Sequence, residues 1–321
     1  MQTQDSRRIN LNRIKKRKAK QALNRLYSLP GMGSLKSQVD EFIHFAKISK
    51  LRLEHGLKSE AHSNHMLFLG NPGTGKTTAA RLIGEAFAYM GLLNTEQENI
   101  PFVEIHHSDI VSELVGRAEK NVEKKFEEAR GGVLFIDEAY TFIGTDSHKS
   151  GEKVVAVIVQ MMEDMRDEVM VIAAGYPKQM EKFMDYNPGL RSRFPNKVCF
   201  QDYGIPDLLK IAEFICEERD YRMSSEFTDR LSVHLLKEIN QPGFGNARSV
   251  RNIVERSIKR QAIRLSEMEE PQVQVNDLML LTDQDMEEPI TNGASEKEEL
   301  IHQLKLIHER LEELELLEML G

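Results

Sequence analysis

The chain has 321 residues, of which 40% are hydrophobic and 29% are charged, and its formal net charge is −8. This composition is typical of a globular protein of about two domains, and the acidic total disfavours a protein that coats nucleic acid. The two cysteines, Cys199 and Cys216, are too few for a disulfide scaffold, and no apolar run is long enough to span a bilayer. The sequence therefore predicts a cytoplasmic protein without a membrane span.

The first segment of the chain is strongly basic. Residues 1–20 hold eight Lys and Arg residues against one Asp. Such a charge run is usually solvated, so we predict that residues 1–26 form a flexible or marginally helical arm. Contact with nucleic acid is the alternative function for this arm.

Short apolar runs then alternate with helix-forming stretches. The runs with the character of buried strands are 65–70, 101–105, 132–137, 169–175 and 197–201, and the predicted helices between them lie near 76–90, 117–129 and 152–166. Strands that alternate with helices indicate a parallel sheet covered on both faces. We therefore predict an α/β domain over residues 27–203.

The pattern changes at Pro206, after which strand signals are few. Four helical segments are predicted, at 206–219, 225–239, 246–265 and 275–281. They indicate a smaller, all-helical domain over residues 204–284. The last segment, 285–321, is acidic, and its stripe Leu300, Leu304, Ile307, Leu311 and Leu314 predicts a helix too short for a coiled coil, which packs on its own protein or on a partner.

A phosphate-binding motif lies between the first predicted strand and its helix. The stretch GNPGTGKT matches the pattern G-x-x-x-x-G-K-[ST], whose glycines let backbone N–H groups turn toward phosphates. Lys76 is predicted to contact the β- and γ-phosphates of ATP, and the Thr77 hydroxyl to bind Mg²⁺. The predicted nucleotide-binding residues are Gly70, Asn71, Pro72, Gly73, Thr74, Gly75, Lys76, Thr77 and Thr78.

A second motif, GGVLFIDEAY, places two carboxylates after a buried strand. Asp137 and Glu138 follow four apolar residues and come about sixty residues after Lys76. Ligands gather at the carboxyl edge of a parallel sheet, so Asp137 is predicted to hold Mg²⁺ and Glu138 to act as the general base that polarises the attacking water. An acidic pair on the surface is the alternative interpretation of these residues taken alone.

With both motifs present, the chain resembles the AAA+ ATPases and, more narrowly, the CbbX/CfxQ family. The resemblance runs from about Leu29 to Leu281 and is carried by GNPGTGKTTAARLIG, GGVLFIDEAY, AAGYPKQMEKFMDYNPGLRSRFP and GNARSVRNIVERSIKRQAIRL. It implies a five-stranded parallel sheet in the order 5-1-4-3-2, a helical lid and a homo-oligomeric ring, usually a hexamer, with ATP at each subunit junction. The stretch NPGLRSRFP resembles the sporulation branch of the family more than its red-type Rubisco activases.

The resemblance also implies roles for three arginines. Arg193 matches the arginine finger that acts on the nucleotide of the adjacent subunit, with Arg191 as the second candidate. Arg248 matches the sensor 2 arginine, which contacts the phosphates in cis. An ordinary loop arginine that pairs with a carboxylate is the alternative for Arg193.

Further positions are implied by the resemblance. Leu29, Gly31 and Met32 match the adenine pocket, with a plain turn and core packing as the alternative. The polar sensor 1 residue that the family often has at the end of the fourth strand is replaced by Gly175-Tyr176. The predicted pore loop is Leu114, Val115 and Gly116, where the family commonly has an aromatic residue first; a surface loop is the alternative.

Three classes of function follow from these motifs. The first is a ring ATPase that remodels a partner protein or complex, associated with sporulation or acting as a Rubisco activase. The second is a nucleic-acid motor that uses the basic arm, which the acidic total disfavours. The third is an ATP-dependent switch or scaffold that applies no force.

Overall fold

The structure, a computed structural model, describes residues 2–58, 63–110, 117–143, 148–268 and 273–286. It divides into two compact units, and each is described by itself. The first unit consists of Met1–Asn71 and Gly75–Gln201, and the second of Pro72–Thr74 and Asp202–Gly321.

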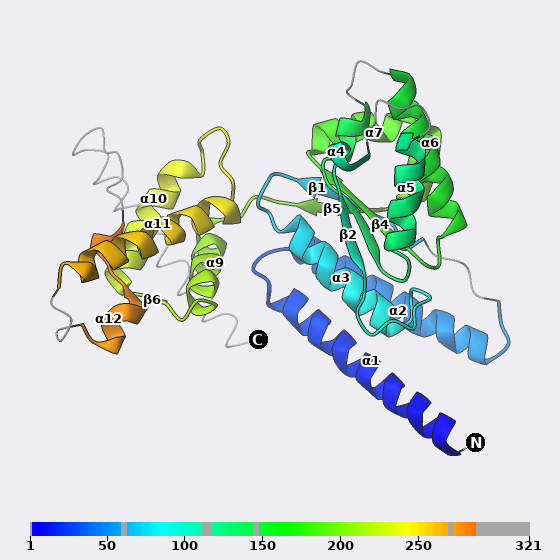
Figure 1. Cartoon of the computed structure of the whole chain (residues 1–321), viewed down its shortest axis with the longest axis horizontal. Helices are drawn as coiled ribbons and strands as arrows, with labels where there is room; N and C mark the ends of the chain where they lie inside the picture. Colours follow the sequence, from blue (N-terminus) through cyan, green and yellow to red (C-terminus); the bar gives the residue numbers. More distant parts are fainter. Residues whose placement is uncertain (1, 59–62, 111–116, 144–147, 269–272, 287–321) are drawn as a thin grey trace. The chain divides into compact units, whose positions relative to one another are not determined.

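The first unit is built on a five-stranded parallel sheet (Figure 1). The strands are β1 (Met66–Gly70), β2 (Phe102–Ile105), β3 (Val133–Ile136), β4 (Met170–Gly175) and β5 (Asn196–Phe200). Their order is β2-β3-β4-β1-β5, and all neighbouring pairs are parallel. The predicted order 5-1-4-3-2, which is the same order counted from the other edge, is confirmed.

Helices cover both faces of this sheet (Figure 1). On one face lie α1 (Gln2–Ser28), α2 (Gly33–Glu54) and α3 (Lys76–Met90), and on the other α4 (His107–Ile110), α5 (Arg117–Glu128), the 3₁₀ helix η1 (Ala139–Ile143), α6 (His148–Asp164), α7 (Pro177–Tyr186) and α8 (Pro188–Arg193). The three predicted helices correspond to α3, α5 and α6. The short helices α7 and α8 were not among the predicted segments.

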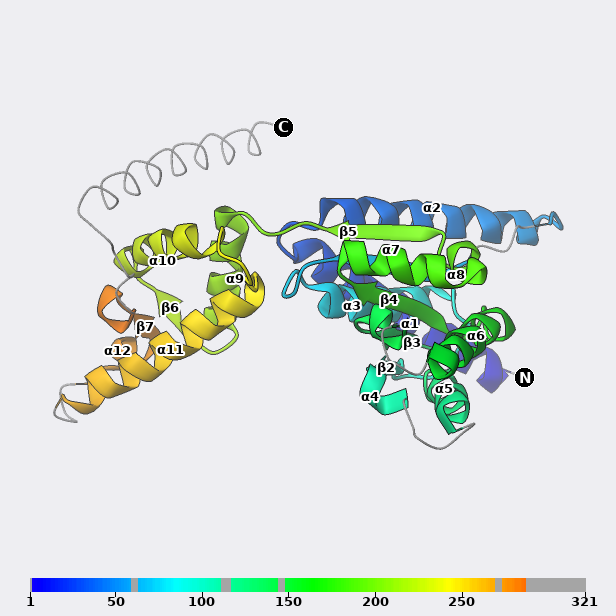
Figure 2. The ribbon, with the colours of Figure 1, turned by 90° about the horizontal axis from the view of Figure 1, so that it is seen from above.

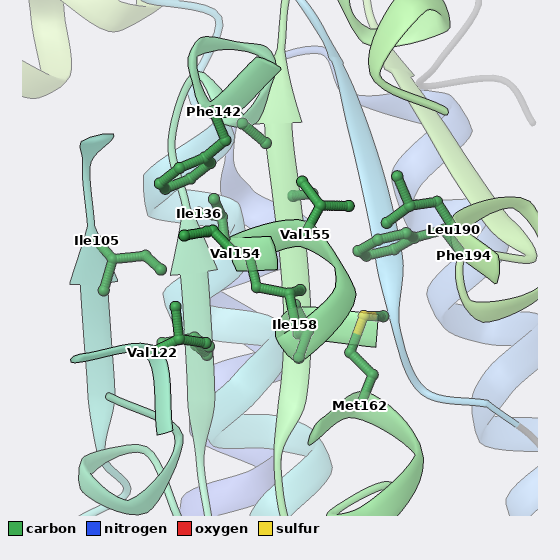
Figure 3. Close-up of a cluster of buried hydrophobic side chains, with 14 of the residues drawn as sticks. Ile105, Val122, Ile136, Phe142, Val154, Val155, Ile158, Met162, Leu190 and Phe194 are labelled. Atoms are coloured by element: carbon green, nitrogen blue, oxygen red, sulfur yellow. The ribbon is translucent and has the colours of Figure 1, made fainter. Parts of the chain in front are cut away.

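Alternating side chains of each strand enter two separate cores. In β1, Met66 and Phe68 pack with the α1–α3 side, while Leu67 and Leu69 pack with the α5–α8 side. This is the period of two that a strand buried on both faces requires. Figure 3 shows part of the second core, where α6 places Val155, Ile158 and Met162 toward the sheet.

The N-terminal segment is helical, which is the second of the two states predicted for it. The segment expected to be a flexible or marginally helical arm is one helix, α1, that packs along α3. Its apolar side chains Ala22 and Leu26 are buried in the core, because the segment carries an apolar stripe between its charges. Lys15 and Lys18 donate hydrogen bonds of 2.9 Å each to the carbonyl oxygens of Thr95 and Glu98.

The second unit is helical, as predicted. It contains α9 (Ile205–Glu217), α10 (Ser225–Glu238), α11 (Ala247–Ser266) and α12 (Val275–Met279), followed by the short η3 (Asp283–Asp285). To these the structure adds a two-residue parallel ladder of β6 (Arg222–Met223) with β7 (Leu280–Leu281). The short helix η3 is held against α11 by the fully buried Asp285. Its two carboxylate oxygens accept bonds of 2.8 and 2.9 Å from Arg264.

Two structural predictions are outside the described residues. They are the acidic helical tail beyond residue 286 and the pore loop Leu114–Gly116. Figure 2, a view turned by 90°, shows the same layers of the first unit from another side. Among the helices described, none is both long and apolar enough to pass through a membrane.

Candidate active site

The two sequence motifs leave the sheet at the same edge. In the parallel register Leu69 of β1 lies opposite Gly175 of β4, and Ile136 of β3 lies opposite Ala173 of β4. The glycine-rich loop after β1 and Asp137 after β3 are therefore separated by one strand only. This is the carboxyl edge, where ligands of open α/β sheets bind.

The glycine-rich loop ends in the first turn of α3. Gly75 precedes the helix with a φ of 87°, in the left-handed region that favours glycine, and it has no side chain to cap the helix. The N-terminus of a helix is where backbone N–H groups bind anions, and no side-chain cap lies at this position of α3. The Lys76 ammonium donates to the carbonyl oxygens of Gly70 and Asn71, at 2.9 and 2.7 Å. Thr77 is half-buried beside it and Thr78 is exposed.

The tip of this loop, Pro72–Thr74, belongs to the second unit. The Gly73 carbonyl accepts a bond of 3.1 Å from the Ala247 N–H, and the Asn246 amide donates to the Pro72 carbonyl at 3.2 Å. A Cβ atom at Gly73 would lie 1.9 Å from the Gly245 oxygen, so only glycine fits. The buried Asn246 was predicted as the start of a helix, and its contact with the loop tip was missed.

Two more residues of the second unit lie near this tip. The Tyr203 hydroxyl donates to the Thr74 carbonyl at 3.0 Å, and burial raises the pKa of Tyr203 to about 12, so the hydroxyl keeps its proton. Arg248 is exposed in the first turn of α11, and its N–H donates to the Gly245 carbonyl at 2.9 Å. Its guanidinium is therefore accessible, as a phosphate-contacting group requires.

The carboxylate pair has a constrained backbone. Asp137 is half-buried, and its Oδ1 accepts a bond of 3.0 Å from the Glu138 N–H. Glu138 is exposed and has a φ of 49°, which is uncommon for a residue other than glycine. The Glu138 carbonyl accepts two bonds of 2.8 Å from Thr141, one from the N–H and one from the hydroxyl. Strained backbone held on both sides is typical of functional sites.

Tyr140 lies between these carboxylates and the end of β4. The pKa of Tyr140 is raised by burial first and then by the neighbouring Glu138 charge. The ring packs beside that of Tyr176, with centroids 6.1 Å apart and planes at 48°. Sequence reasoning missed this residue, although it stands two positions after Glu138.

Both candidate finger arginines pair with carboxylates of their own unit. Arg193 Nη2 lies 3.0 Å from Glu163 Oε2 in α6. Arg191 contacts Asp185 at 2.5 Å and Glu181 at 3.1 Å, and the bond to Asp185 is the first cause that raises its pKa. Arg193 Nε is buried, and within the described part of the chain it has no hydrogen-bond partner. The alternative interpretation of Arg193, as an arginine paired with a carboxylate, thus describes this structure, and the finger role stays a prediction.

A buried histidine, His65, lies at the start of β1 near Arg193. His65 Nδ1 accepts a bond of 3.0 Å from the Val171 N–H, so the ring proton lies on Nε2 and is donated to the Met162 carbonyl at 3.1 Å. Burial, with the nearby Arg193 charge as a smaller cause, lowers the pKa of His65 to about 4. The neutral ring is a structural support for the sheet edge.

The residues matched to the adenine pocket form a turn. Gly31 and Met32 both have left-handed backbones, with φ of 62° and 61°, and the partly buried Leu29 and Met32 pack against the α1–α3 core. The Lys36 ammonium donates to the Leu29 carbonyl at 2.7 Å. A turn with core packing is present, and the adenine contact stays a prediction.

A parallel sheet with a glycine-rich loop before a helix, and an Asp-Glu pair at the same edge, defines a P-loop nucleotide-binding protein. The comparisons with known proteins narrow this class. The model of the ATPase family associated with various cellular activities (AAA) matches residues 66–202, and the AAA lid domain model matches residues 205–296. The chain belongs to this AAA family and is an ATPase.

Relatives place it in the CbbX/CfxQ family. The chain is 37% identical over 262 residues to stage V sporulation protein K of Bacillus subtilis (strain 168), covering 81% of this chain and 80% of that protein. It is 35% identical over 238 residues to the chloroplastic ribulose bisphosphate carboxylase/oxygenase activase of Cyanidioschyzon merolae, covering 74% and 80%. Protein CbbX of Cereibacter sphaeroides is 35% identical over 249 residues, covering 77% and 79%.

Solved structures agree on the fold. The FIGL-1 AAA domain in complex with ADP aligns with a TM-score of 0.54 at 17% identity, covering 83% of this chain and 85% of that chain. At this identity the match supports the fold and no finer detail.

Proposed function

We propose that the chain is a cytoplasmic ring ATPase that uses ATP hydrolysis to remodel a partner protein or complex. The observation that carries the proposal is the shared sheet edge, where Lys76 after β1 and the Asp137-Glu138 pair after β3 are separated by one strand. A lysine that can bind phosphate and a carboxylate that can accept a proton lie at the same edge of the sheet. This combination favours ATP hydrolysis over nucleotide binding without hydrolysis.

The proposed chemistry assigns one role to each group. Lys76, Gly75 and the first N–H groups of α3 bind the phosphates. The Thr77 hydroxyl and the Asp137 carboxylate are hard oxygen donors that suit Mg²⁺, which neutralises phosphate charge when bound. Glu138 accepts a proton from the attacking water while the new bond to the γ-phosphorus forms and the bond to the leaving ADP oxygen breaks.

The proposed assembly is a homo-oligomeric ring, most simply a hexamer. Arg193 would leave Glu163 and stabilise charge on the γ-phosphate of the neighbouring subunit, with Arg191 as the second candidate. An arginine supplied in trans raises hydrolysis by about 10³–10⁵ in GTPases, which makes assembly a condition for full activity. Arg248 is proposed to contact the phosphates, and Leu29, Gly31 and Met32 the adenine.

The substrate side of the proposal rests on the sequence and the relatives. We propose that the pore loop Leu114–Gly116 grips the partner polypeptide. Similarity to stage V sporulation protein K supports a role associated with sporulation, and the similarity to Rubisco activases supports the second candidate, activation of a Rubisco-like enzyme complex.

The test is a nucleotide-trapped pulldown. Glu138→Gln should bind ATP yet hydrolyse it at least about 100-fold more slowly, because the base is lost and the phosphate contacts remain. Partners retained by this form with ATP are identified by mass spectrometry. The matched control is Lys76→Ala, which should fail to bind ATP and retain none of them. Parent-rate hydrolysis by Glu138→Gln contradicts the assignment of the base, and recovery of nucleic acid alone favours the motor over the remodeller.

A further inference from the structure

At the tip of the glycine-rich loop, residues 72–74, three consecutive carbonyl groups accept hydrogen bonds from residues of the same compact unit. The three bonds run from the Asn246 amide to Pro72 at 3.2 Å, from the Ala247 N–H to Gly73 at 3.1 Å and from the Tyr203 hydroxyl to Thr74 at 3.0 Å. The tip of the loop is therefore held on its carbonyl side.

These carbonyl contacts fix the direction of the N–H groups in the same loop. The peptide bonds here are trans, and in a planar trans peptide the C=O and the N–H of the next residue point in opposite directions. The N–H groups of Gly73, Thr74 and Gly75 are therefore turned away from the three donors. Successive N–H groups that face one side of a loop form a concave site for anions such as phosphate.

Asn246 is suited to this contact by its side chain and not by its backbone. Its φ of 51° and ψ of −127° define a conformation in which glycine is the least strained residue. The side chain, however, is only 1% exposed, and its amide also donates to Asp202 Oδ1 at 2.8 Å. Its Oδ1 accepts from the Tyr203 N–H at 2.9 Å. A glycine could not make these bonds, and an aspartate has no N–H to donate.

We propose that Asn246 and Tyr203 are positioning residues that hold the glycine-rich loop in its phosphate-binding conformation before the nucleotide arrives. A loop that is already ordered loses less conformational entropy when it binds, so these two side chains raise the affinity for ATP and ADP. They act on the carbonyl side of the loop, so the rate at saturating ATP depends on them little. This inference rests on the proposed phosphate-binding role of the loop.

The first test is Asn246→Gly, which removes the amide and relieves the backbone. Loss of the buried hydrogen bonds should weaken the binding of ADP about tenfold, as measured by isothermal titration calorimetry on the full chain. The KM for ATP should rise by a similar factor, while kcat stays within about twofold. The matched control is Asn252→Ala, which removes an exposed amide from the same helix and should keep the parent values.

A second variant, Asn246→Asp, separates the donated bond from the accepted one. Its carboxylate still accepts from the Tyr203 N–H, but it cannot donate to Pro72 and it repels Asp202, so ADP should again bind at least about tenfold more weakly. Parent affinity for ADP in Asn246→Gly, even with a lower temperature of thermal unfolding, shows a structural role alone and overturns the proposal. A fall in kcat with an unchanged KM for ATP contradicts it as well.

A third variant covers the case in which the Asn246 variants fold poorly. Tyr203→Phe keeps the buried ring and removes only the hydroxyl that donates to Thr74, so ADP should bind about threefold more weakly. Parent affinity for ADP in Tyr203→Phe refutes the shared role of the two residues. ADP binding needs neither Glu138 nor a second subunit. A parent chain that fails to bind ADP therefore contradicts the nucleotide site itself, whereas parent-like variants contradict only the positioning role.

Discussion

His65 illustrates how a single buried side chain fixes the amino edge of the sheet, at the start of β1 and β4. Its ring joins β4 to the end of α6, because Nδ1 accepts from Val171 while Nε2 donates to Met162. Both ring nitrogens are satisfied only in the neutral form, since a protonated ring has no acceptor for the Val171 N–H. The neighbouring Arg193 adds a charge that also disfavours protonation.

The buried ring predicts an acid-sensitive stability. The pKa of His65 is lowered from 6.5 to about 4 on folding, so the unfolded chain binds the proton more tightly than the folded one. The contribution to the unfolding free energy is therefore full above pH 6.5 and is lost as the pH falls from about 6.5 toward 4, by about 1.4 kcal/mol per pH unit. Urea unfolding at pH 7.5 and 5.5 measures this loss.

A histidine outside the core provides the control for this experiment. His65→Gln should lower stability at both pH values and remove about 1 kcal/mol of the difference between them. His55→Gln, at an exposed position after α2, should leave the difference as it is in the parent. An unchanged pH difference in His65→Gln contradicts the prediction.

Among the elements, α3 shows how closely a helix approaches the sheet. Gly84, in the middle of α3, faces Val133 of β3, and a Cβ atom at Gly84 would lie 2.1 Å from Val133 Cγ2. Because Gly84 has no side chain, α3 packs closely against β3. The first residues of α3 belong to the phosphate loop. The contact of Gly84 with Val133 therefore also affects the distance between this loop and the sheet.

This packing predicts that alanine at position 84 lowers the stability of the protein, although alanine favours helix formation. Gly84→Ala gains about 1 kcal/mol of helix propensity and loses about 1–3 kcal/mol by overpacking, and since the added Cβ would lie at 2.1 Å, well inside contact distance, we expect the upper part of that range and a fall of about 2 kcal/mol in the unfolding free energy. Adding Val133→Ala should recover part of the loss. Gly33→Ala, at a site with nothing within 4 Å, should cost nothing. A parent-like or higher stability of Gly84→Ala would show that α3 can move away from β3 without loss of stability, which contradicts the prediction.

Elements with long, periodic patterns were predictable from sequence, and short ones were not. The segment predicted as 76–90 is the helix Lys76–Met90, because an apolar face repeats along it after the glycine loop. The helices α7 and α8 start at Pro177 and Pro188 and have only 10 and 6 residues, so α7 shows a single helical repeat, the buried Met180, Phe183 and Met184. The two-residue strands β6 and β7 carry no pattern at all and exist through tertiary contact.

The positions of the candidate site residues in the fold were predictable where a motif fixes them, and their chemical roles stay predictions. Lys76, Asp137 and Glu138 follow from motifs whose spacing along the chain fixes their position at a sheet edge. The packing of the Tyr140 ring over Gly175 depends on the turn into η1 and on the absence of a side chain at Gly175, which no local pattern reports. The pairing of Arg193 with Glu163 joins α8 to α6 and likewise needs the fold.

At the scale of the whole molecule, the pairing of Arg193 and Arg191 bears on whether ATP hydrolysis would need a second subunit. Arg193 and Arg191 are both engaged by carboxylates of their own unit, on α6 and α7. Their side chains are partly exposed, and such pairs contribute little stability in water. A γ-phosphate carries more negative charge than one carboxylate, so in the proposed ring the exchange of Glu163 for a neighbouring γ-phosphate would cost Arg193 little.

This arrangement predicts complementation between two inactive forms. Arg193→Ala and Glu138→Gln should each hydrolyse ATP poorly, since every junction of either ring lacks one part. In an equal mixture, a junction that joins the intact pocket of the first form to the intact arginine of the second is complete, and random mixing gives about one quarter of the parent rate. The control is a mixture of Lys76→Ala with Glu138→Gln, in which both changes damage the pocket itself and no junction is complete, so the rate should not recover. Steady-state phosphate release decides the matter: an Arg193→Ala ring with the parent rate, or an equal recovery in both mixtures, would show that the arginine does not act across the junction.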